Sequence, residues 1–447
     1  MLPDAAPLFA VGLLLALAAS IAVAVALGAS GPSLGIAFAA GLGLMCVTAL
    51  AIWRYDAAVA LGFLLLGFVR IEPAPVDGVL AIVMAVALVT GRFDLRSAPM
   101  WANGLVALFL AVNLLACMEA VKASVAASFL GVTVYLCVLG LWTAGYVRTI
   151  PRARMVLILW VGVGVVSAAL STLALYVAFP GSSEFHELYV DRAQGLFKDP
   201  NVYGPFLVPA AILVLHELLE PRLLRGGRLF KLVCLSVLVL GVTTSYSRAA
   251  WLNLGVGVLV MLAVLPLRRG GVRRAGTLLL TLVACLGAAG ATVIATGSSS
   301  FLEERAQYQT YDTDRFGAQR SGVELAAEHP IGVGPGQFEL LAPISAHSTY
   351  VRALAEEGVV GLVLLSALML ATLGAASRNV LRGRSTCGLS STALLAAWCG
   401  LLVNSVFVDT LHWRHLWILA GLIWAGSMLP AALPAQASSS AGARNPT

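Results

Sequence analysis

The chain has 447 residues, of which 60% are hydrophobic and only 11% are charged. Soluble globular proteins carry about 25% charged residues, so this chain cannot cover a water-exposed surface, and its solvent must be lipid. Its formal net charge of +6 does not indicate a nucleic-acid partner, because the basic residues follow a membrane topology instead.

Apolar runs that are long enough, or nearly long enough, to cross a bilayer recur along the whole chain. They lie near residues 7–29, 33–53, 57–70, 77–90, 101–118, 124–147, 155–179, 201–219, 230–247, 249–267, 274–297, 347–376, 390–408 and 412–432. The third and fourth runs are short and are thin spans, a re-entrant pair or half-helices. The sequence therefore predicts an all-α polytopic membrane protein with roughly 12 to 14 transmembrane helices.

The distribution of Lys and Arg predicts a cytoplasmic N-terminus, because most basic residues then fall in inside connections. The connections RGGVRR (269–274) and RNVLRGR (378–384) fix this orientation. Two large loops then lie outside, at about residues 180–200 and 298–346. We expect residues 1–432 to form a single transmembrane bundle and residues 433–447, which are small and polar, to be a disordered cytoplasmic tail.

The second outside loop has helical composition over residues 315–329, where Val323 and Leu325 would pack on the bundle. Glycines between Gly332 and Gly336 then end the helix in a turn.

The first loop holds Arg192, followed by a predicted helix start at Asn201. An arginine here is either an interfacial anchor or an anion clamp, because a guanidinium matches phosphate bidentately. The free N–H groups of a helix N-terminus at Asn201 would favour an anion at the same place.

Three further arginines belong to outside connections. Arg248 stands in a tight turn between two apolar runs, where it is a simple connector or leans into a bundle cavity. Arg315 and Arg320 lie in the second loop, where arginines are usually solvated. Because a histidine follows at the end of the same loop, a functional role for these two arginines is also considered.

That histidine is His347, which precedes a long apolar run. An imidazole at a membrane interface is often only a polar tip, but its pKa near 6.5 suits a general base at neutral pH. Glu356 and Glu357 would lie deep in a continuous helix, where charges are costly. A kink or re-entry near Gly358 would relieve this cost.

His412 and His415 have i, i+3 spacing, which would allow a metal pair. Trp413 and Trp417 alongside them favour an interfacial aromatic belt instead. We find no zinc, P-loop or nucleophile-elbow motif, and predict no metal site and no cofactor.

Taken in order, these residues resemble the O-antigen ligase and polymerase superfamily of bacterial membrane glycosyltransferases. Arg192-Ala-Gln-Gly-Leu196 is similar to the family's Arg-x-x-x-Leu motif in the first periplasmic loop. His347-Ser348, nine further residues and then Gly358-Val-Val-Gly361 fit its histidine motif. The stretches DPNVYG and HPIGVGPGQF add to the likeness, which covers roughly residues 185–375.

The resemblance implies a GT-C-like fold with short helices in a large periplasmic loop, and a metal-independent transfer. The donor would be a glycan on undecaprenyl diphosphate, and the acceptor a sugar hydroxyl of lipid A–core or another glycolipid. The protein would lie among the lipids of the bacterial inner membrane, with its site facing the periplasm. The expected site residues are His347 and Arg315 for catalysis, and Arg192, Arg248, Asn201 and Arg320 for the diphosphate.

Several alternatives stay open. A polymerase would use a lipid-linked repeat unit as acceptor, and a protein O-glycosyltransferase is a third branch. A lipid-linked oligosaccharide flippase belongs to another class and would show paired repeats or mid-membrane polar residues in both halves. Here the spans before residue 190 are nearly free of charge and ionisable residues crowd one face, which favours chemistry at the outer face.

Overall fold

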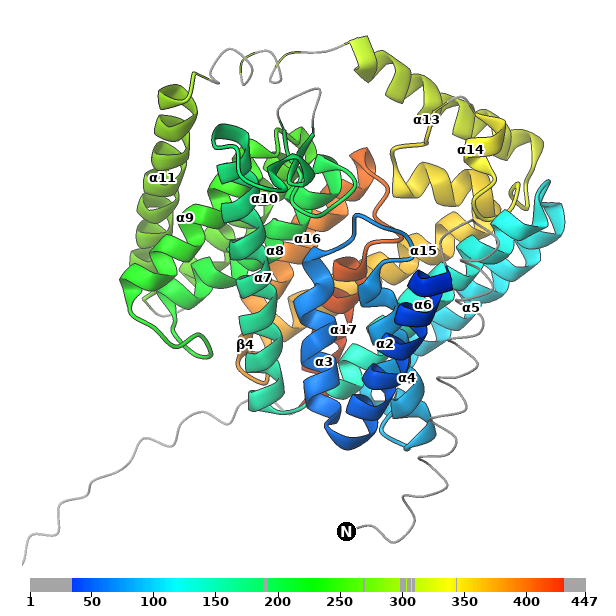
Figure 1. Ribbon diagram of the computed structural model, residues 1–447, viewed down its shortest axis with the longest axis horizontal. Helices are drawn as coiled ribbons and strands as arrows, with labels where there is room; N and C mark the ends of the chain where they lie inside the picture. Colours follow the sequence, from blue (N-terminus) through cyan, green and yellow to red (C-terminus); the bar gives the residue numbers. More distant parts are fainter. Residues whose placement is uncertain are drawn as a thin grey trace, which may run out of the picture.

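The computed structural model describes residues 34–187, 192–267, 270–297, 303, 307, 310–342 and 344–429. The predicted first span at 7–29 and the tail at 433–447 lie outside the described residues. The described chain is a helical bundle with two short β-pairs (Figure 1).

Every predicted apolar run after the first contains a helix. These helices are α2 (Leu34–Trp53), α3 (Tyr55–Leu64), α4 (Pro75–Val89), α5 (Met100–Ala116), α6 (Ala123–Tyr146), α7 (Ile150–Tyr176), α8 (Pro200–Leu219), α9 (Arg228–Thr244), α10 (Arg248–Val264), α11 (Gly271–Ala295), α15 (Thr349–Leu381), α16 (Ser391–Phe407) and α17 (Arg414–Met428). Seven helices in the described ranges are long and apolar enough to cross a membrane. The prediction of an all-α polytopic membrane protein is therefore confirmed, while the total of 12 to 14 spans stays a prediction.

The second loop contains α13 (Thr310–Glu328), where the composition predicts a helix, and the short α14 (Phe338–Leu341). The strands are two-residue antiparallel pairs. β1 (His186–Glu187) pairs with β2 (Arg192–Ala193), and β3 (Ser385–Thr386) pairs with β4 (Leu389–Ser390).

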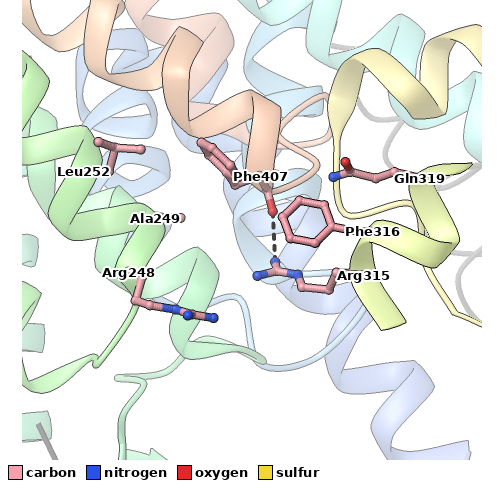
Figure 2. Close-up of a pocket in the computed structure, with 7 residues that line it drawn as sticks. All are labelled: Arg248, Ala249, Leu252, Arg315, Phe316, Gln319 and Phe407. Carbon is pink, nitrogen blue, oxygen red and sulfur yellow. Dashed lines mark hydrogen bonds between the residues drawn. The ribbon is translucent and has the colours of Figure 1, made fainter. Parts of the chain in front are cut away.

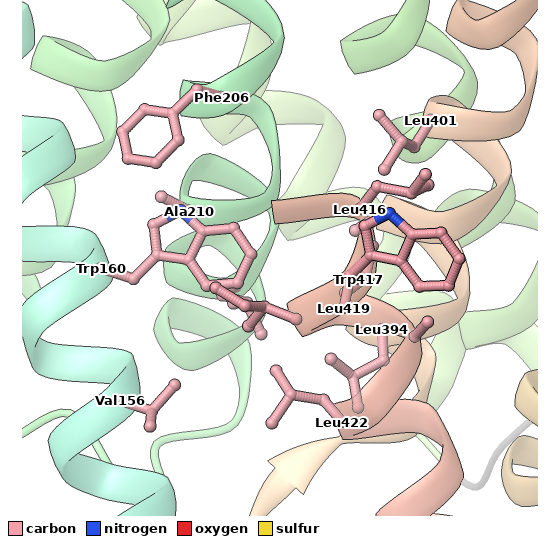
Figure 3. Close-up of a cluster of buried hydrophobic side chains, with 14 of the residues drawn as sticks. Val156, Trp160, Phe206, Ala210, Leu394, Leu401, Leu416, Trp417, Leu419 and Leu422 are labelled. Atoms are coloured by element: carbon pink, nitrogen blue, oxygen red, sulfur yellow. The ribbon is translucent and has the colours of Figure 1, made fainter. Parts of the chain in front are cut away.

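The core is centred on α8, whose residues are buried along nearly the whole helix. Figure 3 shows its Phe206 and Ala210 beside Trp160 of α7, with Trp417 of α17 across the cluster. A helix that is apolar all round belongs in the interior, where α8 provides a fixed support for the elements that surround it.

Helices α10 and α16 pack closely because small residues line their contact. A Cβ atom added at Gly257 would lie 3.3 Å from the Ala396 carbonyl oxygen, and one added at Gly400 would lie 2.3 Å from Asn253 Oδ1. Small residues allow such close approach between membrane helices. The packing brings the first turn of α10 opposite the last turn of α16.

The connections gather on two faces, as an alternating topology requires. On one face, the Val69 amide donates to the Leu196 carbonyl at 2.8 Å, and the Lys122 amide donates to Gln337 Oε1 at 2.8 Å. α13 and α14 lie at this end of the bundle (Figure 1).

On the opposite face, basic residues of the predicted inside connections make the contacts. Arg148 donates to Ser97 Oγ at 2.9 Å, and Arg152 donates to Asp56 Oδ1 at 3.1 Å. The two loops that the sequence predicts to lie outside therefore share one face, away from these arginines.

The interpretation of Trp413 and Trp417 as an interfacial aromatic belt is wrong. Their exposed fractions are 7% and 2%, and Trp417 Nε1 donates to the Leu411 carbonyl at 2.8 Å. His412 lies 3.0 Å from Thr133 Oγ1 and packs on the Phe129 ring. An apolar run predicts burial in lipid and burial in protein equally well, and here protein covers the rings.

Helix α15 is broken at Gly358, the position where a kink or re-entry would relieve the cost of burying Glu356 and Glu357. Gly358 has φ +71° and ψ −172°, a conformation that is essentially restricted to glycine. A Cβ atom at this position would lie 2.3 Å from the Pro330 carbonyl oxygen. The break ends the helical segment that carries Glu356 and Glu357 and lets the loop at Pro330 approach.

We predict that Gly358→Ala lowers the free energy of unfolding by about 1–3 kcal/mol or more, because alanine would be strained in this backbone conformation and would clash with the Pro330 carbonyl. The measurement is the midpoint of thermal unfolding in detergent. Gly374→Ala, in the same helix with open space around it, is the matched control and should leave the midpoint unchanged or raised. Equal midpoints for the two variants would contradict this account of the break.

Candidate active site

A cavity of about 250 Å³ lies at the loop-bearing face, between α10, α13 and α16. Its lining residues are Arg248, Ala249, Leu252, Arg315, Phe316, Gln319 and Phe407. Figure 2 shows the two arginines on opposite sides of one space, with the apolar side chains above them. The cavity therefore combines two cations with an apolar wall.

Arg248 is the first residue of α10 and follows a tight turn, as the sequence predicts. The turn is made by Tyr246, which has φ +49°, and by Ser247, whose hydroxyl caps the helix by accepting from the Ala250 amide at 3.4 Å. Arg248 Nη1 donates to the Gln307 carbonyl at 3.2 Å. A helix N-terminus adds its own positive potential to the guanidinium, so this wall favours an anion.

Arg315 reaches the cavity from α13. Its Nη2 donates to the Phe407 carbonyl at 2.9 Å, which is the bond drawn in Figure 2. Gln319, one turn later, donates to the Val406 carbonyl at 3.5 Å. The two bonds dock α13 on the end of α16 and close the cavity on that side.

Arg320 lies outside the lining of this cavity. Its side chain is 83% exposed and pairs with Glu324 at 3.0 Å. Five residues of α-helix turn through about 500°, so Arg320 cannot share the face of Arg315. The sequence groups the two arginines by proximity along the chain, and the helix separates them.

His347 stands directly before the N-cap of α15 and has a left-handed backbone, with φ +46°. Burial lowers the pKa of its imidazole, and the nearby Arg315 guanidinium lowers it further, whereas Asp199 of the first loop opposes the shift. A positive neighbour disfavours the imidazolium form. At neutral pH, His347 is therefore held as an uncharged imidazole that can accept a proton.

Arg192 and Asn201 are in contact. Arg192 Nη2 donates to Asn201 Oδ1 at 3.1 Å, and Arg192 Nε donates to the Ser245 carbonyl at 2.9 Å. The side chain is buried and also lies 3.6 Å from Glu187 Oε2. Because Ser245 precedes Arg248 by one turn, these bonds connect the first loop and the start of α8 to the turn that carries Arg248.

The other residues that line the cavity were not predicted from the sequence. Phe316 and Gln319 lie one residue and one turn after Arg315, so the helix predicted over residues 315–329 could have placed them beside it. Nothing in the sequence distinguishes Leu252 and Phe407 from the other apolar residues of their membrane runs. Within the described ranges, no three His, Cys, Asp or Glu side chains gather as metal ligands.

Comparison with known proteins bears on this site directly. A family model described as O-antigen ligase matches residues 233–366. This match supports a relationship to the O-antigen ligase superfamily over that part of the chain. The matched region extends from α9 to just beyond the break in α15, and it contains Arg248, Arg315 and His347, while Arg192 lies before it. Members of this family are membrane glycosyltransferase-like enzymes, and the ligase branch is compatible with the match. No curated protein matches the chain.

We predict that the pKa of His347 lies below 6.5, and that Arg315→Gln raises it, because the substitution removes a positive charge that disfavours protonation. The measurement is an NMR titration of the labelled imidazole in detergent. Arg320→Gln, which changes an exposed arginine of the same helix, should leave the pKa of His347 unchanged. A lower His347 pKa in Arg315→Gln would contradict the proposed electrostatics.

Proposed function

We propose that the protein is an O-antigen ligase that transfers a glycan from undecaprenyl diphosphate to a sugar hydroxyl of lipid A–core. The observation that carries this proposal is the cavity between Arg248 and Arg315, two arginines from different helices, in the electrostatic neighbourhood of a neutral His347. The family match covers these three residues.

The two arginines suit the leaving group. Breaking the bond between the sugar and the diphosphate leaves negative charge on the phosphate oxygens, and guanidinium groups on two sides stabilise that charge. The apolar side chains of Leu252, Phe316 and Phe407 suit the first isoprene units of the lipid carrier. A diphosphate with a prenyl tail therefore matches both halves of the cavity.

His347 suits the acceptor. Its uncharged imidazole accepts the proton of the attacking hydroxyl while the new bond forms between that oxygen and the anomeric carbon. The bond from the anomeric carbon to the diphosphate oxygen breaks, and its electron pair leaves with the lipid diphosphate. Arg315, which lies near both groups, holds the donor and keeps the imidazole uncharged.

The distribution of charge between the two faces supports a reaction at the periplasmic face of the bacterial inner membrane. Arginines such as Arg148 and Arg152 crowd the opposite face, and the positive-inside rule makes that face cytoplasmic. The donor and the lipid A–core acceptor both present their glycans on the periplasmic side. Their lipid tails lie in the outer leaflet, beside the cavity. Residues 1–432 act in this proposal as one bundle.

We predict that His347→Ala lowers glycan transfer at least about 100-fold, because positioned proton transfer contributes that much. Purified protein would receive undecaprenyl-diphosphate glycan with either lipid A–core or a second lipid-linked repeat unit as acceptor. His329→Ala, which removes an exposed histidine of the same loop, should keep its activity.

The two acceptor arms of this assay separate ligase from polymerase. Transfer to lipid A–core supports the ligase, and chain extension on the lipid-linked repeat instead would assign the polymerase. Normal transfer by His347→Ala would overturn the role of the imidazole.

We predict that Arg192→Lys loses most of the transfer activity, at least about tenfold. A lysine is a point donor that cannot reproduce a planar fork spanning Ser245 and Asn201, so the turn carrying Arg248 loses its support. The initial rate at saturating donor is the measurement. Arg378→Lys, on the opposite face, is the matched control. Unchanged rates for both variants would contradict the supporting role of Arg192.

A further inference from the structure

The break in α15 is occupied by the loop that precedes α14. The Val333 amide donates to the Ala355 carbonyl at 2.9 Å, and the Gly334 amide donates to the Glu356 carbonyl at 2.9 Å. A continuous helix would use those carbonyls itself. Because Gly358 interrupts the helix, the loop takes over the bonds and is fixed to α15 through its backbone.

The side chain of Glu356 adds two more bonds to the same loop. Its Oε2 accepts from the Gly336 amide at 2.8 Å, and its Oε1 accepts from the Phe338 amide at 3.2 Å. The residue is only 2% exposed. Both carboxylate oxygens are thus used to hold loop backbone, and bonds of this kind to a charged group are about twice as strong as neutral ones.

Arg352 supports this carboxylate from one turn earlier in α15. It lies 3.5 Å from Glu356 Oε1, 2.5 Å from Glu339 Oε1 and 2.9 Å from Asp409 Oδ2. It also donates to Ser345 Oγ at 3.2 Å. One buried guanidinium therefore connects α15, α14, the α16–α17 connection and the segment that leads to His347.

The loop in turn positions α13. Phe338, whose amide Glu356 holds, is fully buried and packs close to Gly322 of α13. It belongs to a small cluster, separate from the main core, that comprises Phe338, Ala342, Ala346 and Ala355 with Leu325 and Val351. This cluster joins Leu325 of α13 to Ala346, the neighbour of His347, so it sets the position of the Arg315 helix relative to His347.

We propose that Glu356 is a positioning residue for glycan transfer. Its carboxylate holds Gly336 and Phe338 of the loop that occupies the break of α15, and through Phe338 it fixes Arg315 and His347 relative to each other. Glu356 does not line the cavity, so it acts through the elements that do. The effect on catalysis rests on the proposed function, whereas the effect on the loop does not.

Glu357 provides a matched control beside it. It is also 2% exposed, but its Oε2 has no hydrogen-bond partner within the part of the chain that the structure describes. A substitution there changes the same chemical group at the same depth without removing a bond to the loop.

The experiment compares Glu356→Gln with Glu357→Gln in the full chain. A glutamine has one acceptor oxygen, so it can keep only one of the two amide bonds and loses the charge that pairs with Arg352. We expect amide hydrogen exchange at Gly336 and Phe338 to rise at least about tenfold in Glu356→Gln, with exchange in residues 361–376 unchanged. We expect kcat to fall about 100-fold, the loss that a small misplacement of reacting groups causes, with little change in KM for the donor.

Glu357→Gln should keep both the exchange rates and kcat within about twofold of the wild-type values. If Glu356→Gln does not fold, Glu356→Asp keeps the charge and should show a partial loss of both amide protection and kcat. Unchanged amide protection in Glu356→Gln, or unchanged kcat despite lost protection, would overturn the proposal. Equal losses in Glu357→Gln would do the same. If the wild-type chain transferred no glycan, the proposed function would fail, and the exchange rates alone would still test whether Glu356 holds the loop.

Discussion

The hydrocarbon core of a bilayer offers no hydrogen-bond partner to a polypeptide backbone, and this constraint shapes the whole protein. Each segment that enters lipid must satisfy its own amides, so the chain is helical almost throughout the described residues. Where a helix is interrupted, as at Gly358, other parts of the protein must take the released groups. Residues 333–338 do so, and the same contact brings the large loop against the bundle.

The constraint also decides where chemistry can occur. Charged side chains are costly within the bilayer, so the arginines of interest lie at helix ends or in the loop. Arg248 begins α10, the main chain of Phe407 ends α16, and Arg315 joins them from α13. Close packing of α10 on α16 through glycines fixes Arg248 and the Phe407 main chain, and the contacts of the second loop fix Arg315. The cavity is therefore a product of helix ends that meet on one face.

Much of this arrangement could be predicted from residues. The apolar runs locate the helices, because a membrane span has a simple length and composition. Adjacent Glu356 and Glu357 before a glycine indicated a break, since two carboxylates would not persist in an uninterrupted span. Arg192 and Asn201 were expected at one place because both flank the start of the same helix.

Other features depend on tertiary packing and left no local signal. Phe407 lines the cavity only because of the register between α10 and α16. Trp413 and Trp417 were assigned to lipid because hydrophobicity does not distinguish lipid from a protein interior. Val323 was expected to pack on the bundle, but it is 52% exposed, while Leu325 two residues later faces the small cluster. The glycine-rich turn at residues 332–336 also binds Glu356, which lies twenty residues after Gly336 in the sequence. Nothing in the sequence of the turn itself indicates that partner.

In the proposed reaction, Arg248 and Arg315 hold a lipid diphosphate between them. Electron cryo-microscopy of the protein in lipid nanodiscs with undecaprenyl diphosphate tests it most directly. We expect diphosphate density between the two guanidinium groups, within hydrogen-bonding distance of both, with the prenyl chain along Leu252 and Phe407. Diphosphate density on the opposite face, near Arg148 and Arg152, would contradict it.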